Sequence, residues 1–316
     1  MQKKIMFFVV MSILLLSISS CVREGPHEKL REEEYRKGTQ GLVMNFLRNA
    51  PPDTVYAGDD VNIIIELRNK GAYPKDTGFE GHLEIGGFDE SALYNGYWEN
   101  GNIISPNLEG RSQDNPEGGY ETKTYRAVAR VPFDGEIYET NINVYSCYRY
   151  ETIATPNVCI DPDPYATVQE KKACQIHDVS LAGGQGAPVA VTRVEEQVSK
   201  DKVHFKIYIR NEGDGTVIAD SAYSGYYYSK CPFDLEHEDL NKVTADVRLS
   251  YSSPIECSPR GDMSDPIRLN ENGEGFIRCS FPKPNTDSAF VTPLWIKLNY
   301  AYSSSISKRI RIINLD

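Results

Sequence analysis

The sequence predicts an all-β protein, and three observations lead to this fold class. From Leu42 onward, short apolar runs are separated by Gly, Pro, Asn and Asp, and no long stretch repeats its apolar residues every 3.6 positions. Two segments alternate apolar and polar side chains, as strands with one buried face do. The phrase "IIELRNKG" at 64–71 is written again as "IYIRNEGD" at 207–214. We therefore expect two tandem antiparallel β-sandwiches of several short strands each.

A signal peptide is predicted for residues 1–20. Lys3 and Lys4 precede an apolar run, 5–16, that is shorter than the roughly 20 residues needed to span a bilayer. The letters "ISSC" up to Cys21 resemble the lipobox of prokaryotic lipoproteins, and this resemblance implies a lipid-modified Cys21 as the mature N-terminus. An ordinary secretory signal and an uncleaved anchor are the alternatives. We expect an extracytoplasmic protein that is held at the cell membrane by its N-terminal lipid.

A charged tether is expected over residues 21–40, because so few apolar side chains cannot offset the entropy lost on ordering. Removing the signal peptide takes away two lysines and changes the formal net charge from −11 to −13. Such acidity argues against a nucleic-acid partner, which would need clustered Lys and Arg. It also leaves the lipid, rather than attraction to anionic headgroups, as the membrane contact.

The first sandwich is predicted over residues 41–168. Its repeated phrase alternates Val61, Ile63, Ile65 and Leu67, which places these four side chains on one face of a strand. The phrase ends in Asn-x-Gly, whose residues tolerate positive φ and so predict a turn. Further strands are expected at "GHLEIGGF" from Gly81, "YRAVARVPF" from Tyr125 and "TNINVYSCYRY" from Thr140.

The second sandwich is predicted over residues 174–316, after a linker at 169–173. Alternation of Val203, Phe205 and Ile207 with polar residues again predicts a strand, and Asn-x-Gly again ends it. The corresponding later strands are expected at "ADVRLSYS" from Ala245, "GFIRCSFP" from Gly275, "LWIKLNYAYSS" from Leu294 and, as a separate last strand, "SKRIRIINL" from Ser307.

A strand ending in aliphatic-x-aliphatic-x-Asn-x-Gly, on an exported chain, resembles the immunoglobulin-like adhesion modules of the CARDB type in archaeal and bacterial surface proteins. The chain also resembles tandem immunoglobulin-like lipoproteins of archaea. The resemblance implies two such modules that serve in adhesion, ligand binding or envelope structure. The segments after the Asn-x-Gly turns are longer than in compact members, so no functional residue is transferred except Cys21.

Six cysteines follow the lipid position, an even number that is typical of a disulfide framework in an oxidising compartment. They are Cys147, Cys159, Cys174, Cys231, Cys257 and Cys279. Six cysteines allow 15 pairings, which a sequence cannot distinguish. Proximity favours Cys147–Cys159 and Cys257–Cys279, which leaves Cys174–Cys231. A zinc site is not expected, because "CQIH" at 174–177 has no partner pair.

Two aromatic stretches are the candidate ligand-binding residues. They supply Tyr94, Tyr97 and Trp98 in the first half and Tyr223, Tyr226, Tyr227 and Tyr228 in the second. Rigid rings among Gly, Ser and Asn give a large contact area at low entropic cost, which suits a glycan or a surface-protein ligand. The alternative is that these rings pack over sheet edges or against the neighbouring sandwich.

No catalytic or cofactor motif is found, so we expect neither an enzyme nor a cofactor. His-Glu-x-x-His and Gly-x-Ser-x-Gly are absent, and "SISK" at 305–308 lacks its companion motifs. "GGQG" at 183–186 leads into a strand rather than a helix, and so reads as a loop. Acidic loops such as "AGDD" and "CIDPDPY" could ligate calcium, but turn chemistry explains them and no metal is expected. The remaining alternatives are a subunit of an extracellular assembly and an enzyme whose residues meet only in the fold.

Overall fold

The structure is a computed structural model that describes residues 35–164, 172–223, 229–254, 256–286 and 288–315. The predicted signal peptide, the predicted lipidation site Cys21 and part of the predicted linker lie outside these ranges. Tyr35–Asp316 form one compact unit. Among the described residues, the named elements of this unit are β-strands apart from the short helical turns η1 (Asp220–Ala222) and η3 (His237–Asp239). The all-β fold class with antiparallel sheets is confirmed.

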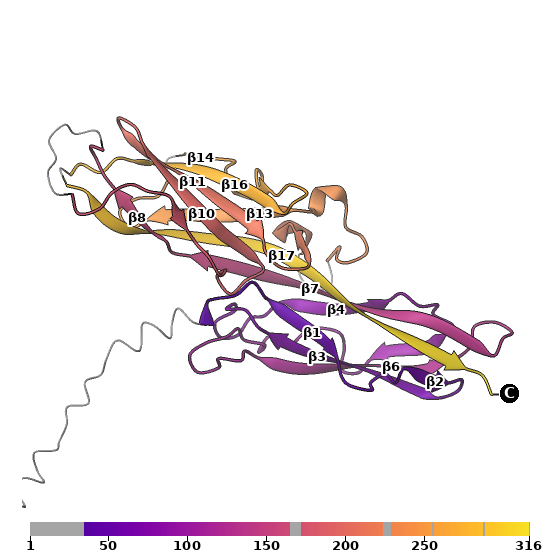
Figure 1. Cartoon of the computed structure of the whole chain (residues 1–316). Helices are drawn as coiled ribbons and strands as arrows, with labels where there is room; N and C mark the ends of the chain where they lie inside the picture. The colour runs from indigo at the N-terminus through magenta and orange to yellow at the C-terminus, as the bar shows by residue number, and fades with distance from the viewer. Residues whose placement is uncertain (1–34, 165–171, 224–228, 255, 287, 316) are drawn as a thin grey trace, which may run out of the picture. The chain divides into compact units, whose positions relative to one another are not determined.

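The strands form three sheets (Figure 1). A four-stranded sheet has the order β1 (Leu42–Phe46), β3 (Asp60–Asn69), β6 (Tyr120–Ala129) and β5 (Leu93–Trp98). A five-stranded sheet has the order β14 (Glu256–Ser258), β16 (Glu274–Pro282), β11 (Lys202–Asn211), β10 (Val189–Val198) and β9 (Val179–Ser180).

The third sheet takes strands from both halves of the sequence, and we call it the shared sheet. Its order is β15 (Ile267–Arg268), β13 (Lys242–Leu249), β17 (Phe290–Ile313), β7 (Ile137–Ala154) and β4 (Gly81–Gly86). Three more strands pair with β17, namely β2 (Thr54–Tyr56), β8 (Asn157–Ile160) and β12 (Thr216–Ile218). Only β2 runs parallel to its partner among the pairings described.

The two repeated phrases lie on equivalent strands, β3 and β11, each near the middle of its sheet. Ile63, Ile65 and Leu67 on β3 are fully buried, and so are Phe205 and Ile207 on β11. The predicted period of two is therefore confirmed in both copies. Each strand turns one face toward the interior because that face carries only aliphatic and aromatic side chains.

β17 is a single strand of 24 residues, so the predicted break before Ser307 is wrong. The residues at 303–306, "SSSI", include no Gly or Pro that would end a strand. β17 pairs with β7 along the whole length of β7, and Figure 1 shows the two strands running side by side. The pairing joins the last long strand of one half to the last long strand of the other.

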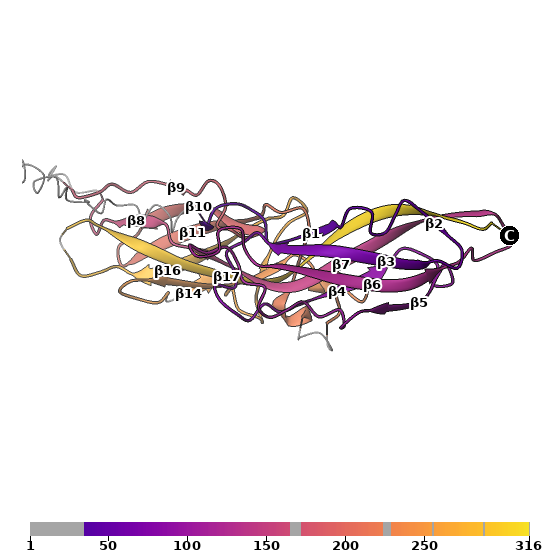
Figure 2. The same ribbon diagram turned by 90° about the horizontal axis from the view of Figure 1, so that it is seen from below.

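The hydrophobic interior is continuous across both halves. One cluster of buried side chains includes Ile65 and Leu83 from the first half and Phe205 and Leu298 from the second. The four-stranded and five-stranded sheets lie beside different stretches of the shared sheet (Figure 2). The chain is thus sandwich-like, but a count of two separate immunoglobulin-like modules is not confirmed, and the boundaries at 41–168 and 174–316 stay predictions.

The first Asn-x-Gly forms a hydrogen-bonded network with a tyrosine of the shared sheet. The Tyr150 hydroxyl donates to Asn69 Oδ1 at 3.1 Å and accepts from the Tyr73 N–H at 3.3 Å. Asn69 Nδ2 donates to the Tyr73 carbonyl at 2.7 Å, and the Gly71 N–H donates to Asn69 Oδ1 at 3.3 Å. The end of β3 is thereby fastened to β7.

The second Asn-x-Gly repeats this network. The Tyr302 hydroxyl donates to Asn211 Oδ1 at 3.2 Å and accepts from the Gly215 N–H at 2.7 Å. Asn211 Nδ2 donates to the Gly215 carbonyl at 2.9 Å, and the Gly213 N–H donates to Asn211 Oδ1 at 3.3 Å. The repeated phrase therefore encodes a strand together with its attachment to the shared sheet. We call the two arrangements the Asn–Tyr networks.

The glycines of the phrase are required for space. Gly71 and Gly213 do not have positive φ, so the reason predicted for them is wrong. A Cβ on Gly71 would lie 1.9 Å from the Tyr150 hydroxyl oxygen, and one on Gly213 would lie 2.5 Å from that of Tyr302. No residue larger than glycine fits at either position, because a tyrosine hydroxyl occupies the space where a side chain would lie.

Four buried tyrosines meet where β7 and β17 pair. Tyr148 lies opposite Tyr302, and Tyr150 lies opposite Tyr300. The Tyr148 hydroxyl accepts from the first N–H of β1 at 3.2 Å, and the Tyr300 hydroxyl accepts from the first N–H of β10 at 3.3 Å. Burial raises the pKa of all four hydroxyls, that of Tyr302 to about 12. The four side chains remain neutral and link all three sheets.

The six cysteines form three disulfides, which indicates a location outside the cytoplasm. Cys257–Cys279 is confirmed, whereas the two other predicted pairs are wrong. The remaining bonds are Cys147–Cys231 and Cys159–Cys174. No helix among the residues described has the length and apolar character of a membrane span.

Cys147 and Cys159 cannot pair because the chain between them is extended. β7 and β8 follow one another along the same partner, β17, with register advancing in one direction. Twelve residues at about 3.3 Å each separate the two cysteines by roughly 40 Å, far beyond the reach of a disulfide. Nearness in sequence is a poor guide to pairing when the intervening residues form a straight strand.

Candidate functional site

The aromatic candidates of the first half lie on β5, an edge strand of the four-stranded sheet. The exposed fractions of Tyr94 and Tyr97 are 38% and 56%. A pairing irregularity between them gives them partners two positions apart on β6, so both side chains lie on one face. Trp98 packs against Tyr125, with ring centroids 5.4 Å apart. Tyr94 and Tyr97 are accessible to a partner, whereas Trp98 takes the packing role.

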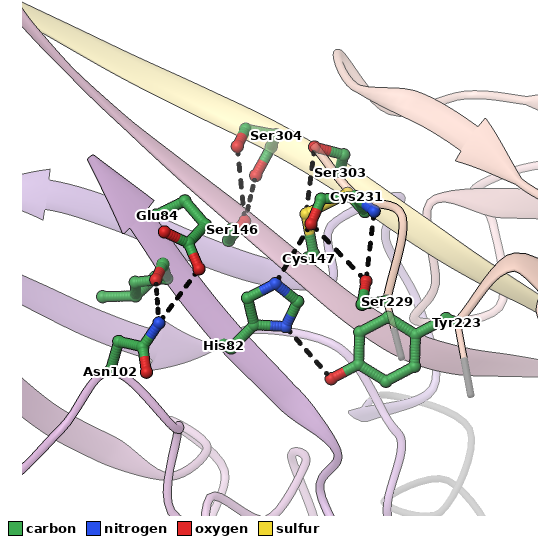
Figure 3. The surroundings of a disulfide bond; sticks show 11 residues. His82, Glu84, Asn102, Ser146, Cys147, Tyr223, Ser229, Cys231, Ser303 and Ser304 are labelled. Atoms are coloured by element: carbon green, nitrogen blue, oxygen red, sulfur yellow. Dashed lines mark hydrogen bonds between the residues drawn. A yellow bond between two sulfur atoms is a disulfide. The ribbon is translucent and has the colours of Figure 1, made fainter. Parts of the chain in front are cut away.

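The aromatic candidates of the second half are not together on the surface. Tyr223 is buried, with 1% exposed, while Tyr226, Tyr227 and Tyr228 lie outside the residues that the structure describes. Figure 3 shows the Tyr223 hydroxyl directed at His82. Tyr223 therefore takes the packing role that the sequence left open.

His82 lies between Tyr223 and the Cys147–Cys231 disulfide (Figure 3). Its Nδ1 is 3.4 Å from the Tyr223 hydroxyl, and its Nε2 is 3.2 Å from the Cys231 carbonyl oxygen. The two rings stack with centroids 5.6 Å apart. Burial lowers the pKa of His82 and raises that of Tyr223, so both are neutral near pH 7. The cluster attaches the segment before β13 to β4 and is structural.

A concave, polar surface lies on the outer face of the five-stranded sheet. We call it the polar groove; its volume is about 740 Å³. Its side chains come from four adjacent strands and the segments beside them: Asp178, Glu195, Gln197, Ser199, Lys202, His204, Lys206, Glu256, Ser258, Arg278 and Ser280. On β11 they alternate with buried Phe205 and Ile207, so they face away from the core.

Cations lie in the middle of the polar groove. Lys206 on β11 is directly opposite Arg278 on β16. The Lys206 ammonium lies 4.4 Å from the centroid of the Tyr208 ring and 4.5 Å from that of Phe276. The Arg278 guanidinium lies 5.4 Å from the Phe276 centroid. Cation–π contacts of this kind hold the charged groups in place without neutralising them.

Carboxylates lie toward the sides of the polar groove. Glu195 on β10 accepts from the Tyr208 hydroxyl at 2.9 Å and pairs with Arg193 at 2.8 Å. Glu256 is on β14, the strand on the other side, where the Cys257–Cys279 disulfide fixes β14 to β16. Asp178 is exposed beside β9. The floor is thus cationic, and its two sides offer hydrogen-bond acceptors.

Hydroxyl, amide and imidazole groups complete the lining. The Ser199 hydroxyl lies 3.2 Å from His204 Nε2. Gln197 is opposite His204, and His204 is opposite Ser280, so a row of neutral polar groups crosses the sheet next to the Lys206–Arg278 row. Such a surface can donate and accept hydrogen bonds along a polar ligand.

Glu196 is a partly buried carboxyl at the polar groove. It pairs across the sheet with buried Phe205, which places it on the core side of β10. Its Oε1 is buried without a hydrogen-bond partner. Burial raises the pKa of Glu196 to about 8; a hydrogen bond from the Cys159 backbone to the carboxyl opposes this rise, and the charge of Asp161 adds to it. This carboxyl is a source of pH-dependent stability.

The acidic loops considered for calcium do not gather ligands. Among the residues described, no group of three or more His, Cys, Asp or Glu side chains is placed to hold a metal ion. Asp161, from "CIDPDPY", is neutralised by the Lys172 ammonium at 2.6 Å. Asp59, from "AGDD", accepts from the Tyr56 N–H, which is turn chemistry.

The sequence did not identify the polar groove. Lys206 and Arg278 are 72 positions apart, and only the register of β11 with β16 brings them together. The available signal was weak: the polar positions of "VHFKIYIR" and "GFIRCSF" hold several cations in an acidic chain. Neither phrase contains a motif that marks it as a site.

No family model matches the chain, and no curated protein matches it either. Among solved structures, the chain is similar to a DUF4466 family protein from Parabacteroides merdae, with 11% identity and a TM-score of 0.20. The match covers 82% of this chain and 99% of that one. A likeness at this identity and TM-score carries no argument about function.

Proposed function

We propose that this protein is a surface binding protein that captures a polar saccharide in the polar groove. In this proposal a lipid on Cys21 attaches the chain to the cell membrane, and residues 22–34 keep the sheets away from the bilayer. The disulfides support an extracytoplasmic setting, and the lipobox resemblance supports the anchor.

The observation that carries the proposal is a groove of about 740 Å³ whose polar side chains come from adjacent paired strands. Ligand sites are concave and orient their ligands with a few fixed polar groups. Here the sheet fixes the backbone positions of the polar groups, because each of them is on a residue that pairs between β11 and β16. These residues are Lys206, His204, Arg278 and Ser280. The groove offers donors at its centre and acceptors at its sides, and a ligand rich in hydroxyl groups can bond with both.

The test is binding of the full chain, extracted in detergent, to a panel of surface glycans. We expect the double variant Gln197→Ala, His204→Ala to lower the affinity at least about tenfold, because each change removes one hydrogen-bonding group from the groove. The matched control is Asn62→Ala, Thr124→Ala on the outer face of the four-stranded sheet, which should leave the affinity unchanged.

A third variant, Tyr97→Ala, decides between the polar groove and the exposed aromatics of β5. If Tyr97→Ala abolishes glycan binding and the groove variant does not, the site lies at the β5 edge and the proposal for the groove is wrong. Loss of binding only in the groove variant supports the proposal.

A further inference from the structure

The cations of the polar groove have an arrangement that costs free energy when the groove is empty. Lys206 and Arg278 are direct cross-strand neighbours, and like charges in that relation repel one another. Among the residues that the structure describes, no carboxylate forms a salt bridge with either of them. The one carboxylate opposite Lys206, Glu195, is instead paired with Arg193 and the Tyr208 hydroxyl.

The two cations also lie against aromatic rings, which restrict their side chains. The rings of Tyr208 and Phe276 flank the Lys206 ammonium, and Phe276 lies under the Arg278 guanidinium. The side chains therefore lose little further entropy when a ligand binds. Two adjacent and unneutralised cations on a chain of net charge −11 are suited to receive an anion.

The surroundings of the cations favour a saccharide over a peptide. Ser199, Gln197, Ser258 and Glu256 offer hydroxyl, amide and carboxylate groups on both sides of the cationic floor. β11 is paired along both edges, and the disulfide-linked β14 covers β16 from Arg278 to Ser280, so a peptide has no free strand edge beside the two cations to extend. A sugar polymer presents hydroxyl groups on both sides of an acidic substituent, which is the pattern that the groove complements.

We propose that the polar groove recognises an acidic saccharide whose carboxylate lies over Lys206 and Arg278 while its hydroxyl groups bond the sides of the groove. This proposal rests on the proposed function and names the ligand class of the same site. Arg278 makes a forked contact to the carboxylate, and Lys206 supplies a second positive charge. Glu195 and Glu256 repel an acid at the sides, so the carboxylate is restricted to the centre of the groove.

The test compares oligogalacturonate with its methyl ester, which keeps the same sugar chain but replaces each charged carboxylate by a neutral methyl ester. The full chain in detergent micelles should bind the acid at least about tenfold more tightly than the ester, and added salt should weaken only the binding of the acid. Arg278→Ala and Lys206→Met should each lower the affinity for the acid about tenfold and leave the affinity for the ester unchanged.

The matched control is Arg68→Ala on the outer face of the four-stranded sheet. The Arg68 guanidinium also lies over an aromatic ring, 5.0 Å from the centroid of Tyr120. This variant should bind the acid as the unchanged protein does. The conservative variant Arg278→Lys should recover part of the lost affinity, since it restores the charge but not the forked contact.

The outcomes are separable. Suppose that acid and ester bind equally well and that the double variant Gln197→Ala, His204→Ala weakens both. This result would contradict the proposal of an acidic ligand but not the proposed function. If the protein binds poly-glutamate more tightly than any acidic saccharide, the proposal that the ligand is a saccharide is wrong. Failure of oligogalacturonate, chondroitin sulfate and neutral glycans alike to bind would overturn both proposals.

Discussion

Gly71 and Gly213 show how one atom can fix the identity of a residue. Each lies where a tyrosine hydroxyl of the shared sheet needs the space of a Cβ, with separations of 1.9 Å and 2.5 Å. The hydroxyl in turn closes an Asn–Tyr network with the asparagine two positions earlier. The repeated Asn-x-Gly is therefore a packing requirement, which explains why it is written twice.

Gly213→Ala should destabilise the protein by about 1–3 kcal/mol, the usual cost of overpacking a filled interior. Tyr302→Phe in the same chain should recover part of this loss, because it removes the oxygen nearest to the new methyl group. The measurement is urea unfolding of the single and double variants. Gly86→Ala is the control, since its Cβ would meet no atom closer than 3.8 Å. Equal stability of the two alanine variants would contradict the prediction.

Glu196 makes the stability depend on pH. Its folded-state pKa of about 8 lies above its usual value of 4.5, so the folded protein favours the protonated carboxyl. Its contribution to stability is fully present below pH 4.5 and is lost as the pH rises toward 8.

Glu196→Gln keeps the shape of the side chain and removes the titration. The variant should match the unchanged protein near pH 4.5 and exceed its free energy of unfolding at pH 8.5 by on the order of 2 kcal/mol. Urea unfolding across this range measures the difference. A difference that is the same at both ends of the range would show that Glu196 does not titrate as described.

At the scale of elements, the disulfides differ in what they connect. Cys147–Cys231 joins β7 to the segment before β13 and closes 84 positions of chain, whereas Cys159–Cys174 closes 15. In the chain-entropy model the longer loop contributes about 4–5 kcal/mol and the shorter about 3 kcal/mol.

Removal of the first bond by Cys147→Ala, Cys231→Ala should therefore lower the melting temperature more than Cys159→Ala, Cys174→Ala. The longer bond also lies against buried His82 and Tyr223, so its loss opens a packed cluster. Calorimetry of both variants tests the order. A larger loss from removal of Cys159–Cys174 would contradict both the loop-length argument and the packing argument.

The individual strands were predictable because a period of two is local. Ile63 and Ile65 alternate with more exposed residues over a few positions, and the strand is recognisable without its partners. The pairing of Lys206 with Arg278 was not predictable, because it depends on register between strands that are distant in sequence. The same is true of Cys147 and Cys231. Burial of Tyr223 was also hidden, since its flanking Gly and Ser residues suggest a surface loop.

At the scale of the whole molecule, the shared sheet makes the two halves depend on each other. β17 takes partners from both, and one cluster of buried side chains crosses between them. The sequence repeat indicated two similar halves, and the Asn–Tyr networks show the similarity in atomic detail. The sequence repeat could not indicate the pairing of β7 with β17, because the sequence of each strand has no feature that identifies its partner.

We expect residues 35–316 to unfold in a single cooperative transition, with equal calorimetric and van't Hoff enthalpies. Residues 174–316 expressed alone should fail to form a stable fold, because β17 would lose β7 along 18 residues and expose that edge. A fragment that folds by itself, or two separate thermal transitions, would show that the halves are independent.

The order of pairing along the chain has a consequence for biosynthesis. β2, β7, β8, β12 and β13 all precede their common partner β17, so none of these pairings can form until Phe290–Ile313 has emerged. The nascent polypeptide would spend most of its elongation with exposed strand edges, a state prone to association with other chains. Holding factors that shield those edges during synthesis would act on this intermediate rather than on the finished protein.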